Sequence, residues 1–154
     1  MKFKILGFVF LLGFSCLQSF AQLMDGQPAV FTQKDSLRGT LSNFRNCYDV
    51  TYYHLAVKIN IEAKTIQGSN SISFKCLSDF EEIQIDLFEN LNIDQILFQG
   101  KALTFKRVYN AVFVKFPNTL LKGQQEKITV FYSGAPNIAK KAPWDGGIVF
   151  SKDE

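Results

Sequence analysis

The sequence predicts an antiparallel all-β domain, most naturally a β-sandwich. Apolar and polar residues alternate in successive short segments, polar turns separate these segments, and no segment shows a convincing period of 3.6 residues. Alternation with a period of two is typical of strands that bury one face. About seven such strands are typical of a two-sheet sandwich. A small barrel would show the same alternation, because periodicity reports burial and not closure.

The N-terminal residues 1–21 are typical of a cleaved secretory signal peptide. Two lysines precede an apolar run from Ile5 to Phe14, and a small-residue site ends at Ala21. The run is about half of the roughly twenty residues that a membrane-spanning helix needs. We therefore expect an exported protein, periplasmic or extracellular, with no membrane partner after cleavage. Cys16 raises the alternative of a lipoprotein, but the leucine expected before a lipidated cysteine is missing.

The length of the chain limits the number of domains, and its net charge limits the kinds of partner. Cleavage after Ala21 leaves 133 of the 154 residues, enough for one domain with a proper core. The formal net charge of +3 falls to +1 when Lys2 and Lys4 leave with a leader that has no acidic residue, so a nucleic-acid partner is not expected. We expect a lead-in segment at 22–46, which packs only locally, and a β-sandwich domain at 47–154.

The first two strands are predicted to form a β-hairpin. In YDVTYYHLAVKINI, the residues of one face of a half-buried strand are Tyr53, Leu55, Val57, Ile59 and Ile61. A polar turn at 62–64 follows. Alternate residues from Ile66 to Cys76 then form the inward face of the return strand.

Further strands follow the hairpin. EEIQIDL alternates cleanly, and LNIDQILF changes phase at Asp94-Gln95, which indicates a β-bulge. Three more strands are predicted at Leu103 to Val108, Ala111 to Phe116 and Lys127 to Tyr132, with a loop from Pro117 to Gln125.

Cys47 and Cys76 flank the predicted hairpin. Cys47 lies just before its first strand and Cys76 near the end of its second, so the fold could bring them close. In an oxidising compartment such a pair could form a disulfide, although two cysteines in one sequence do not establish the bond. Cys47 could also act as a nucleophile, but it has no CxxC partner, so a structural use is favoured.

The sequence contains few groups of residues that could form a catalytic or metal site. His54 is the sole histidine, and zinc sites generally draw three or four ligands from His, Cys, Asp and Glu. It falls on the polar face of a strand, which favours an ordinary sheet residue. Glu82 and Asp86 share the polar face of another strand with Gln84, so we expect a solvated face rather than the carboxylate pair of a glycosidase.

The stretch KKAPWDGG predicts a contact loop. Pro143 restricts the backbone before Trp144, the only tryptophan, and the turn-forming residues Asp145, Gly146 and Gly147 follow. Trp144 could pin the loop to its own domain, or the loop could dock on a separate domain. An exposed tryptophan could also stack on a sugar.

An ordered series of segments resembles the start of secreted M1-family zinc aminopeptidases of the Bacteroidetes type. The series runs from about Phe31 to Glu154 and consists of FTQKDSLRGTLSNFRNCYDVTYYHLAVKIN, TIQGSNSISFK, IQIDLFENLNID, NAVFVKFP, ITVFYSG and KKAPWDGGIVFSKDE. The resemblance implies a saddle-like N-terminal β-domain that precedes a catalytic domain, with the peptide substrate entering between the two. It also implies that Pro143 to Gly147 seat the β-domain on its neighbour.

In that family, zinc is bound through HExxH and a downstream glutamate, and a GxMEN-type loop holds the substrate's amino terminus. No position of this sequence matches these motifs, so no catalytic, zinc or amine-anchoring residue carries over. The resemblance implies zinc for the full-length parent, no cofactor in this chain and no activity of the chain alone. We expect a truncated product or fragment, incomplete at its C-terminal end.

Two other functions fit the sequence. An independent secreted β-sandwich module could bind a glycan or a protein through the Trp144 loop. A small barrel could carry an apolar ligand, which would suit the 16 phenylalanines but would need a cavity.

Overall fold

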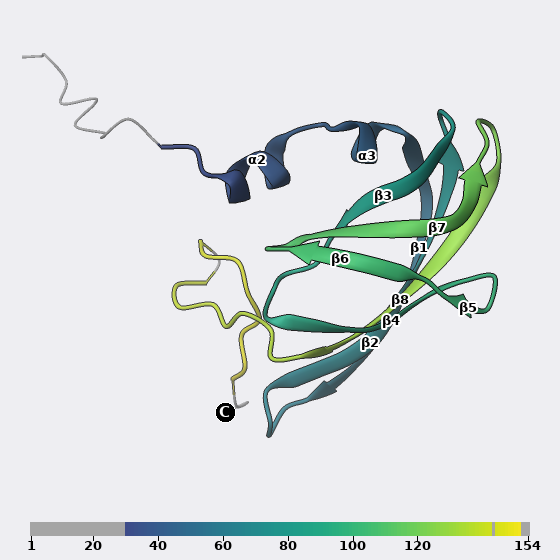
Figure 1. The fold of residues 1–154 in the computed structure, drawn as a ribbon. Coiled ribbons are helices and arrows are strands. Elements are labelled where there is room, and N and C mark those ends of the chain that lie inside the picture. The colour runs from purple at the N-terminus through teal and green to yellow at the C-terminus, as the bar shows by residue number, and fades with distance from the viewer. Residues whose placement is uncertain (1–29, 143, 152–154) are drawn as a thin grey trace, which may run out of the picture. The chain divides into compact units, whose positions relative to one another are not determined.

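The computed structural model describes residues 30–142 and 144–151, so the predicted signal peptide and Pro143 lie outside the described residues. Within this range, two short helices precede eight strands (Figure 1). The helices are α2 (Gln33–Gly39) and α3 (Asn43–Asn46). The strands are β1 (Tyr48–Asn60), β2 (Thr65–Cys76), β3 (Phe80–Asp86), β4 (Leu91–Phe98), β5 (Lys101–Ala102), β6 (Thr104–Val108), β7 (Ala111–Leu120) and β8 (Gln125–Gly134).

The strands form two antiparallel sheets, which confirms the predicted fold class. One sheet has the order β1-β2-β8-β4-β5 and the other the order β3-β7-β6 (Figure 1). The chain passes from the first sheet to the second at Leu103, between β5 and β6, which joins the sheets along one side. On the other side β1 and β3 end their sheets, and no strand of the described residues pairs with their outer edges. The sandwich is therefore closed along one side and open along the other.

The hydrophobic core fills the space between the two sheets. Its buried side chains include Ile72, Phe74, Cys76, Ile83, Ile85, Ile96, Phe98, Val112, Val114, Phe116, Ile128 and Val130. Phe116 lies at its centre, because its ring contacts Phe98 edge to face, with 5.1 Å between ring centroids, and also packs near Phe74. These residues alternate along their strands, as expected for sheets that bury one face.

Most predicted strands are present, and the predicted bulge is confirmed because the pairing of β4 with β8 shifts register between Ile93 and Gln95. The loop predicted to begin at Pro117 is wrong, since β7 continues to Leu120. A proline lacks the amide hydrogen that a sheet needs. It is tolerated here because the pairing of β6 with β7 ends at Lys115, and the ladder between β3 and β7 is irregular beyond that point.

The lead-in segment contains helices that the sequence pattern did not indicate. α2 has seven residues and α3 has four, too short to show a helical period. α2 begins with a capping box, in which the Thr32 side chain accepts from the Asp35 amide and the Asp35 carboxylate accepts from the Thr32 amide. This pattern satisfies amide hydrogens that have no partner inside the helix. The start of this short helix is therefore indicated by its capping residues and not by a helical period.

The described part of the lead-in segment packs on the three-stranded sheet. This corrects two expectations, that the segment packs only locally and that the polar face of β3 is solvated. The Phe44 ring lies edge-on to Phe113 of β7, with 5.4 Å between centroids. Gln84 of β3 is 2% exposed and donates to the Leu37 carbonyl at 2.9 Å. Gln84 belongs to the β3 face that was expected to be solvated, and the helices cover that residue.

Tyr48 links β1 to β3 and predicts a stability change at alkaline pH. Its hydroxyl donates to the Gln84 carbonyl at 2.7 Å, and burial raises the pKa of Tyr48 to about 12 from an ordinary 10.0. Above pH 10 the unfolded chain releases this proton first, so stability is full below pH 10 and falls as the pH approaches 12. We expect a smaller fall in Tyr48→Phe, which lacks the hydroxyl.

Urea unfolding at about pH 9 and about pH 11 measures this difference. The change in the free energy of unfolding between the two pH values is measured for each protein. Because each protein is compared with itself, the cost of losing the Tyr48 hydrogen bond in the variant does not affect the result. An equal fall in both proteins would show that Tyr48 does not keep its proton in the folded state.

No helix among the described residues is long and apolar enough to span a membrane.

Candidate docking surfaces

The predicted contact loop follows β8 and is closed by its own backbone. Ile138 and Ile148 form an isolated parallel bridge, in which the Ile148 amide donates to the Asn137 carbonyl at 2.8 Å and the Ala139 amide donates to the Ile148 carbonyl at 3.2 Å. Gly147, at φ +150°, lies against this bridge. The loop therefore has a defined base.

Asp145 shapes the tip of the loop. Its carboxylate accepts hydrogen bonds from the Lys140 amide at 2.6 Å and the Lys141 amide at 2.7 Å. Desolvation pulls the pKa of Asp145 upward, but these amides outweigh it, so the pKa is lower than usual. The Trp144 amide donates to the Lys141 carbonyl at 2.9 Å. An ionised Asp145 thus organises the turn that carries the tryptophan.

Trp144 is 89% exposed, so its ring does not pin the loop to its own domain. A large aromatic ring held in solvent on a hydrogen-bonded loop fits a contact role. The docking of the loop on another domain stays a prediction.

Gly147 and Gly146 provide a matched test of the loop's shape. A Cβ at Gly147 would lie 2.7 Å from both the Ala139 nitrogen and the Asn137 oxygen, whereas one at Gly146 would meet no atom within 4 Å. We expect Gly147→Ala to destabilise the bridge by about 1 kcal/mol or more, which raises hydrogen exchange at the Ala139 and Ile148 amides about fivefold. Gly146→Ala should leave both rates unchanged. Equal rates in the two variants would contradict the bridge.

An apolar strip on β1 is a second surface. The sequence pattern put Tyr53, Leu55, Val57 and Ile59 on one face of a half-buried strand, and their pairing with β2 puts that face on the inner side of the five-stranded sheet. We call these four residues the β1 strip. Their exposed fractions are 57%, 61%, 44% and 54%, so the predicted burial is wrong although the predicted face is right. Ile61 lies in the following turn and is 70% exposed.

The strip is exposed because the second sheet is too narrow to cover it. Five strands form one sheet and three form the other. Tyr48 and Val50, at the start of β1, still pack against the core. From Thr51 onward every residue of β1 is exposed. The inner face of the larger sheet therefore extends beyond its cover on the open side.

A groove of about 480 Å³ runs between the strip and β3. Its lining includes Tyr53, Leu55, Asn70 and Ile72 from the larger sheet and Ile85 and Asp86 from β3. Asn70 Oδ1 is buried and has no hydrogen-bond partner among the described residues. Sequence reasoning missed Asn70 as a site residue, although a polar residue among the inward positions of β2 was the available signal.

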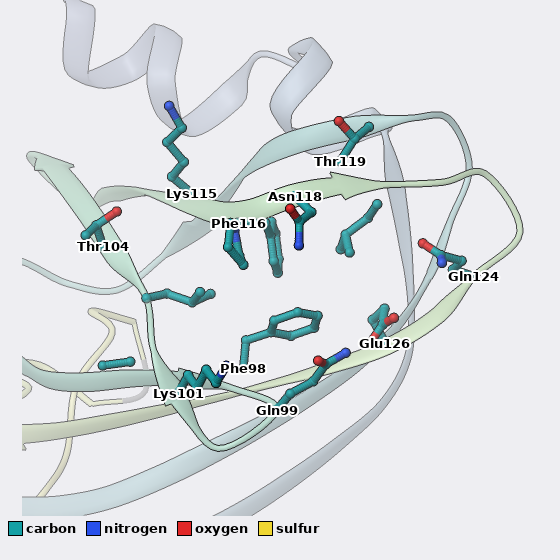
Figure 2. A pocket seen from close by; sticks show the side chains of 14 residues that line it. Phe98, Gln99, Lys101, Thr104, Lys115, Phe116, Asn118, Thr119, Gln124 and Glu126 are labelled. Carbon is teal, nitrogen blue, oxygen red and sulfur yellow. The ribbon is translucent and has the colours of Figure 1, made fainter.

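A cleft of about 660 Å³ opens at the end of the sandwich near β5 (Figure 2). Phe98 and Phe116 are the aromatic residues that line it. Gln99, Gln124 and Glu126 add polar groups to its lining. None of its lining residues is a histidine or cysteine, so it offers no nucleophile with an imidazole base. The lining of this cleft therefore combines two aromatic rings with polar and charged side chains.

The described residues do not fit a zinc site. Within 30–142 and 144–151, no three His, Cys, Asp or Glu side chains gather where they could hold a metal ion. His54 lies exposed on β1, opposite Ser71 of β2. Asp86, on the same face of β3 as Glu82, makes an ion pair with Arg45.

Cys47 and Cys76 are brought together as expected. Tyr48, which follows Cys47, pairs with Cys76, and the Leu77 amide donates to the Cys47 carbonyl at 2.8 Å. Both residues are buried free thiols in the structure, and burial raises both pKa values. The disulfide stays a prediction, which thiol titration of unfolded protein with and without reductant would check.

Comparison with solved structures shows what the fold is similar to. An M1 zinc metallopeptidase mutant from Deinococcus radiodurans, bound to a Tyr-Ser-Ala substrate, matches with a TM-score of 0.55 and 18% identity over 62% of this chain and 22% of that chain. The M1 zinc metallopeptidase from the same organism matches with a TM-score of 0.53 and 19% identity over 58% of this chain and 21% of that chain. No protein-family model and no curated protein matches the chain.

These identities are low, so the likeness shows the fold. The two antiparallel sheets correspond to the N-terminal domain region of M1 zinc metallopeptidases. This chain spans about a fifth of the length of the solved chains it matches.

Proposed function

We propose that the chain is the non-catalytic N-terminal β-domain of an exported M1-type zinc metalloaminopeptidase. The likeness of its fold to M1 zinc metallopeptidases, one of them bound to a Tyr-Ser-Ala substrate, carries the proposal. The ordered motifs that resemble Bacteroidetes-type members support it. In this role the domain is a scaffold for the catalytic domain and forms one wall of the peptide cleft.

The proposal assigns zinc and the catalytic groups to other polypeptide. The HExxH motif, the downstream glutamate and the loop that holds the substrate's amino terminus would belong to the catalytic domain of the parent enzyme. The partners of this chain would be that domain and, in the assembled enzyme, the peptide substrate.

Export follows from the leader and has its own test. Residues 1–21 would be removed, and the mature chain would reside in the periplasm or outside the cell. N-terminal sequencing of the exported protein should begin at Gln22. A cytoplasmic protein that begins at Met1 would overturn this part.

The genomic region that follows codon 154 tests the main proposal. We expect it to encode HExxH and a downstream glutamate, in the same or a broken frame. The extended product should release N-terminal amino acids from peptides in a chelator-sensitive way, and the purified 154-residue chain should release none. Unrelated coding sequence after residue 154, or chelator-sensitive release by the chain alone, would contradict the proposal.

A second candidate is an independent secreted binding module for a glycan or protein. The 89% exposure of Trp144 on a closed loop favours it, because exposed aromatic rings stack on sugars. Glycan-array binding by the purified chain that Trp144→Ala abolishes and Phe88→Ala retains would favour this function. Phe88 is 57% exposed and lies outside the loop.

A further inference from the structure

We propose that the outer edge of β1 pairs with the same edge of a second copy of this chain, in an antiparallel two-fold dimer. His54 would lie opposite its own copy, and Asp49 of each chain would lie opposite Lys58 of the other. The two five-stranded sheets would then form one continuous sheet. The inference goes beyond the proposed function and does not depend on it, because it uses only residues of this domain.

β1 is a long edge strand that lacks most of the features that prevent pairing with another chain. It has 13 residues, it ends the five-stranded sheet, and every residue from Thr51 onward is exposed. It contains neither proline nor glycine, and Lys58 is its only lysine. Natural proteins usually shorten such edges, or protect them with prolines, charges or a covering element. An edge of this length is therefore expected to have a partner.

A bulge at Thr51 brings Asp49 and Lys58 to the same face of β1. The register with β2 shifts between Val50 and Tyr52, so Thr51 is an extra residue. Asp49 and Lys58 are an odd number of positions apart, and in a regular strand they would lie on opposite faces. The extra residue changes the phase, so both lie on the face opposite the β1 strip. Both are exposed, and neither makes an ion pair within the described part of the chain.

An antiparallel pair centred on His54 makes β1 complementary to its own copy. With Thr51 kept in its bulge, the positions on either side of His54 pair as Tyr53 with Leu55, Tyr52 with Ala56, Val50 with Val57 and Asp49 with Lys58. Residues opposite each other in such a pair have Cβ atoms about 4.5–5.5 Å apart. The apolar side chains of the two strips would therefore cover one another on the inner face. On the outer face, each lysine would lie beside a carboxylate.

Pairing through β1 gives a closed dimer and not a fibre, because it uses the same edge in both copies. The opposite end of the five-stranded sheet is β5, which has only two residues, and the chain leaves it for the other sheet at Leu103. The outer edge of β3 is occupied, since the Tyr48 hydroxyl donates to the Gln84 carbonyl and Arg45 pairs with Asp86. The second copy would extend the layer of the five-stranded sheet and leave these contacts in place.

Charge reversal tests the register, because Asp49 and Lys58 lie about 25 Å apart along one strand and cannot touch within one chain. We expect the purified native chain to dimerise in sedimentation velocity. Lys58→Asp and Asp49→Lys should each weaken the dimer at least about tenfold, since each creates two like-charged pairs. An equal mixture of the two variants should dimerise like the native chain, because only the mixed dimer has two pairs of opposite charge. The matched control is Lys106→Asp, at an exposed position of β6, and it should dimerise like the native chain.

Any of three outcomes in sedimentation overturns the proposal. They are a native chain that stays monomeric at about 0.1 mM, single variants that dimerise as strongly as the native chain, and a mixture that stays monomeric. Hydrogen exchange decides the question if a variant has a lowered melting temperature. Dilution of the native dimer should speed exchange of amides in residues 50–57 and leave those of β6 unchanged, and the opposite result would assign the dimer to another surface. None of these measurements uses peptidase activity, so the two proposals fail separately.

Discussion

Replacing Phe74 with alanine is expected to lower the free energy of unfolding by about 3–5 kcal/mol. Phe74 is 1% exposed and lies in the core between the sheets. Its ring lies 5.6 Å from the Tyr48 ring and 6.3 Å from the Phe116 ring, measured between centroids. Removing it leaves a cavity between β-strands, which the backbone cannot easily close. Urea unfolding with an unchanged m-value measures the loss.

Phe88→Ala is the matched control, because Phe88 lies between β3 and β4 and is 57% exposed. We expect it to change the free energy of unfolding by less than about 0.5 kcal/mol. If the two variants were equally stable, the sheets would not pack through Phe74.

Gly68→Ala should destabilise the domain by about 2 kcal/mol or more, because it adds an atom where backbone already lies. Gly68 of β2 pairs with Val57 of β1 and with Tyr132 of β8. A Cβ there would overlap the Ala56 carbonyl and lie 3.1 Å from the Tyr132 hydroxyl. Since Tyr132 is 7% exposed and Ala56 is part of the backbone ladder, neither neighbour moves away at low cost.

The control for this variant is Gly39→Ala. A Cβ at Gly39, the last residue of α2, would meet no atom within 4 Å, and alanine is favoured over glycine in helices by about 1 kcal/mol. We therefore expect Gly39→Ala to be neutral or stabilising in the same urea experiment. A Gly68→Ala protein as stable as Gly39→Ala would show that β1 and β2 do not approach each other as closely as the structure has it.

The open side of the sandwich connects these stability predictions to the proposed role. Tyr132 lies over Gly68 and keeps the middle of the sheet covered, whereas Val57, on the other side of Gly68, faces solvent. Core variants should therefore destabilise the chain by itself. Variants of the β1 strip should affect only assembly with a partner, because their side chains are already exposed. This difference separates a folding defect from a docking defect.

Much of the local structure could be predicted from residue patterns. Alternation along β1 and β2 correctly predicted which side chains share a face, and the change of phase at Asp94 correctly predicted the bulge. The pattern failed where an element was short or unusual. α2 and α3 span seven and four residues, and β7 runs through Pro117 where its ladder is irregular. Such features depend on capping and on neighbouring strands, which a period cannot report.

One candidate site was predicted from the sequence, and another was found only in the structure. The sequence alone predicted a contact loop from its single tryptophan and its glycines, but the Asp145 hydrogen bonds and the exposure of Trp144 became known only from the structure. The sequence pattern did not single out Asn70, whose buried Oδ1 has no hydrogen-bond partner among residues 30–142 and 144–151 and which lines a groove together with residues of β3.

The sequence by itself determined which residues share a face of each strand and where most of the turns lie, because these depend on residue type and spacing along the chain. Only the tertiary structure decided which faces are covered. Tyr53 and Ile72 pair side by side with the same inward orientation, yet one is 57% exposed and the other 7%. The difference arises because burial depends on the width of the opposing sheet, and that width is set by pairings between segments far apart in the sequence.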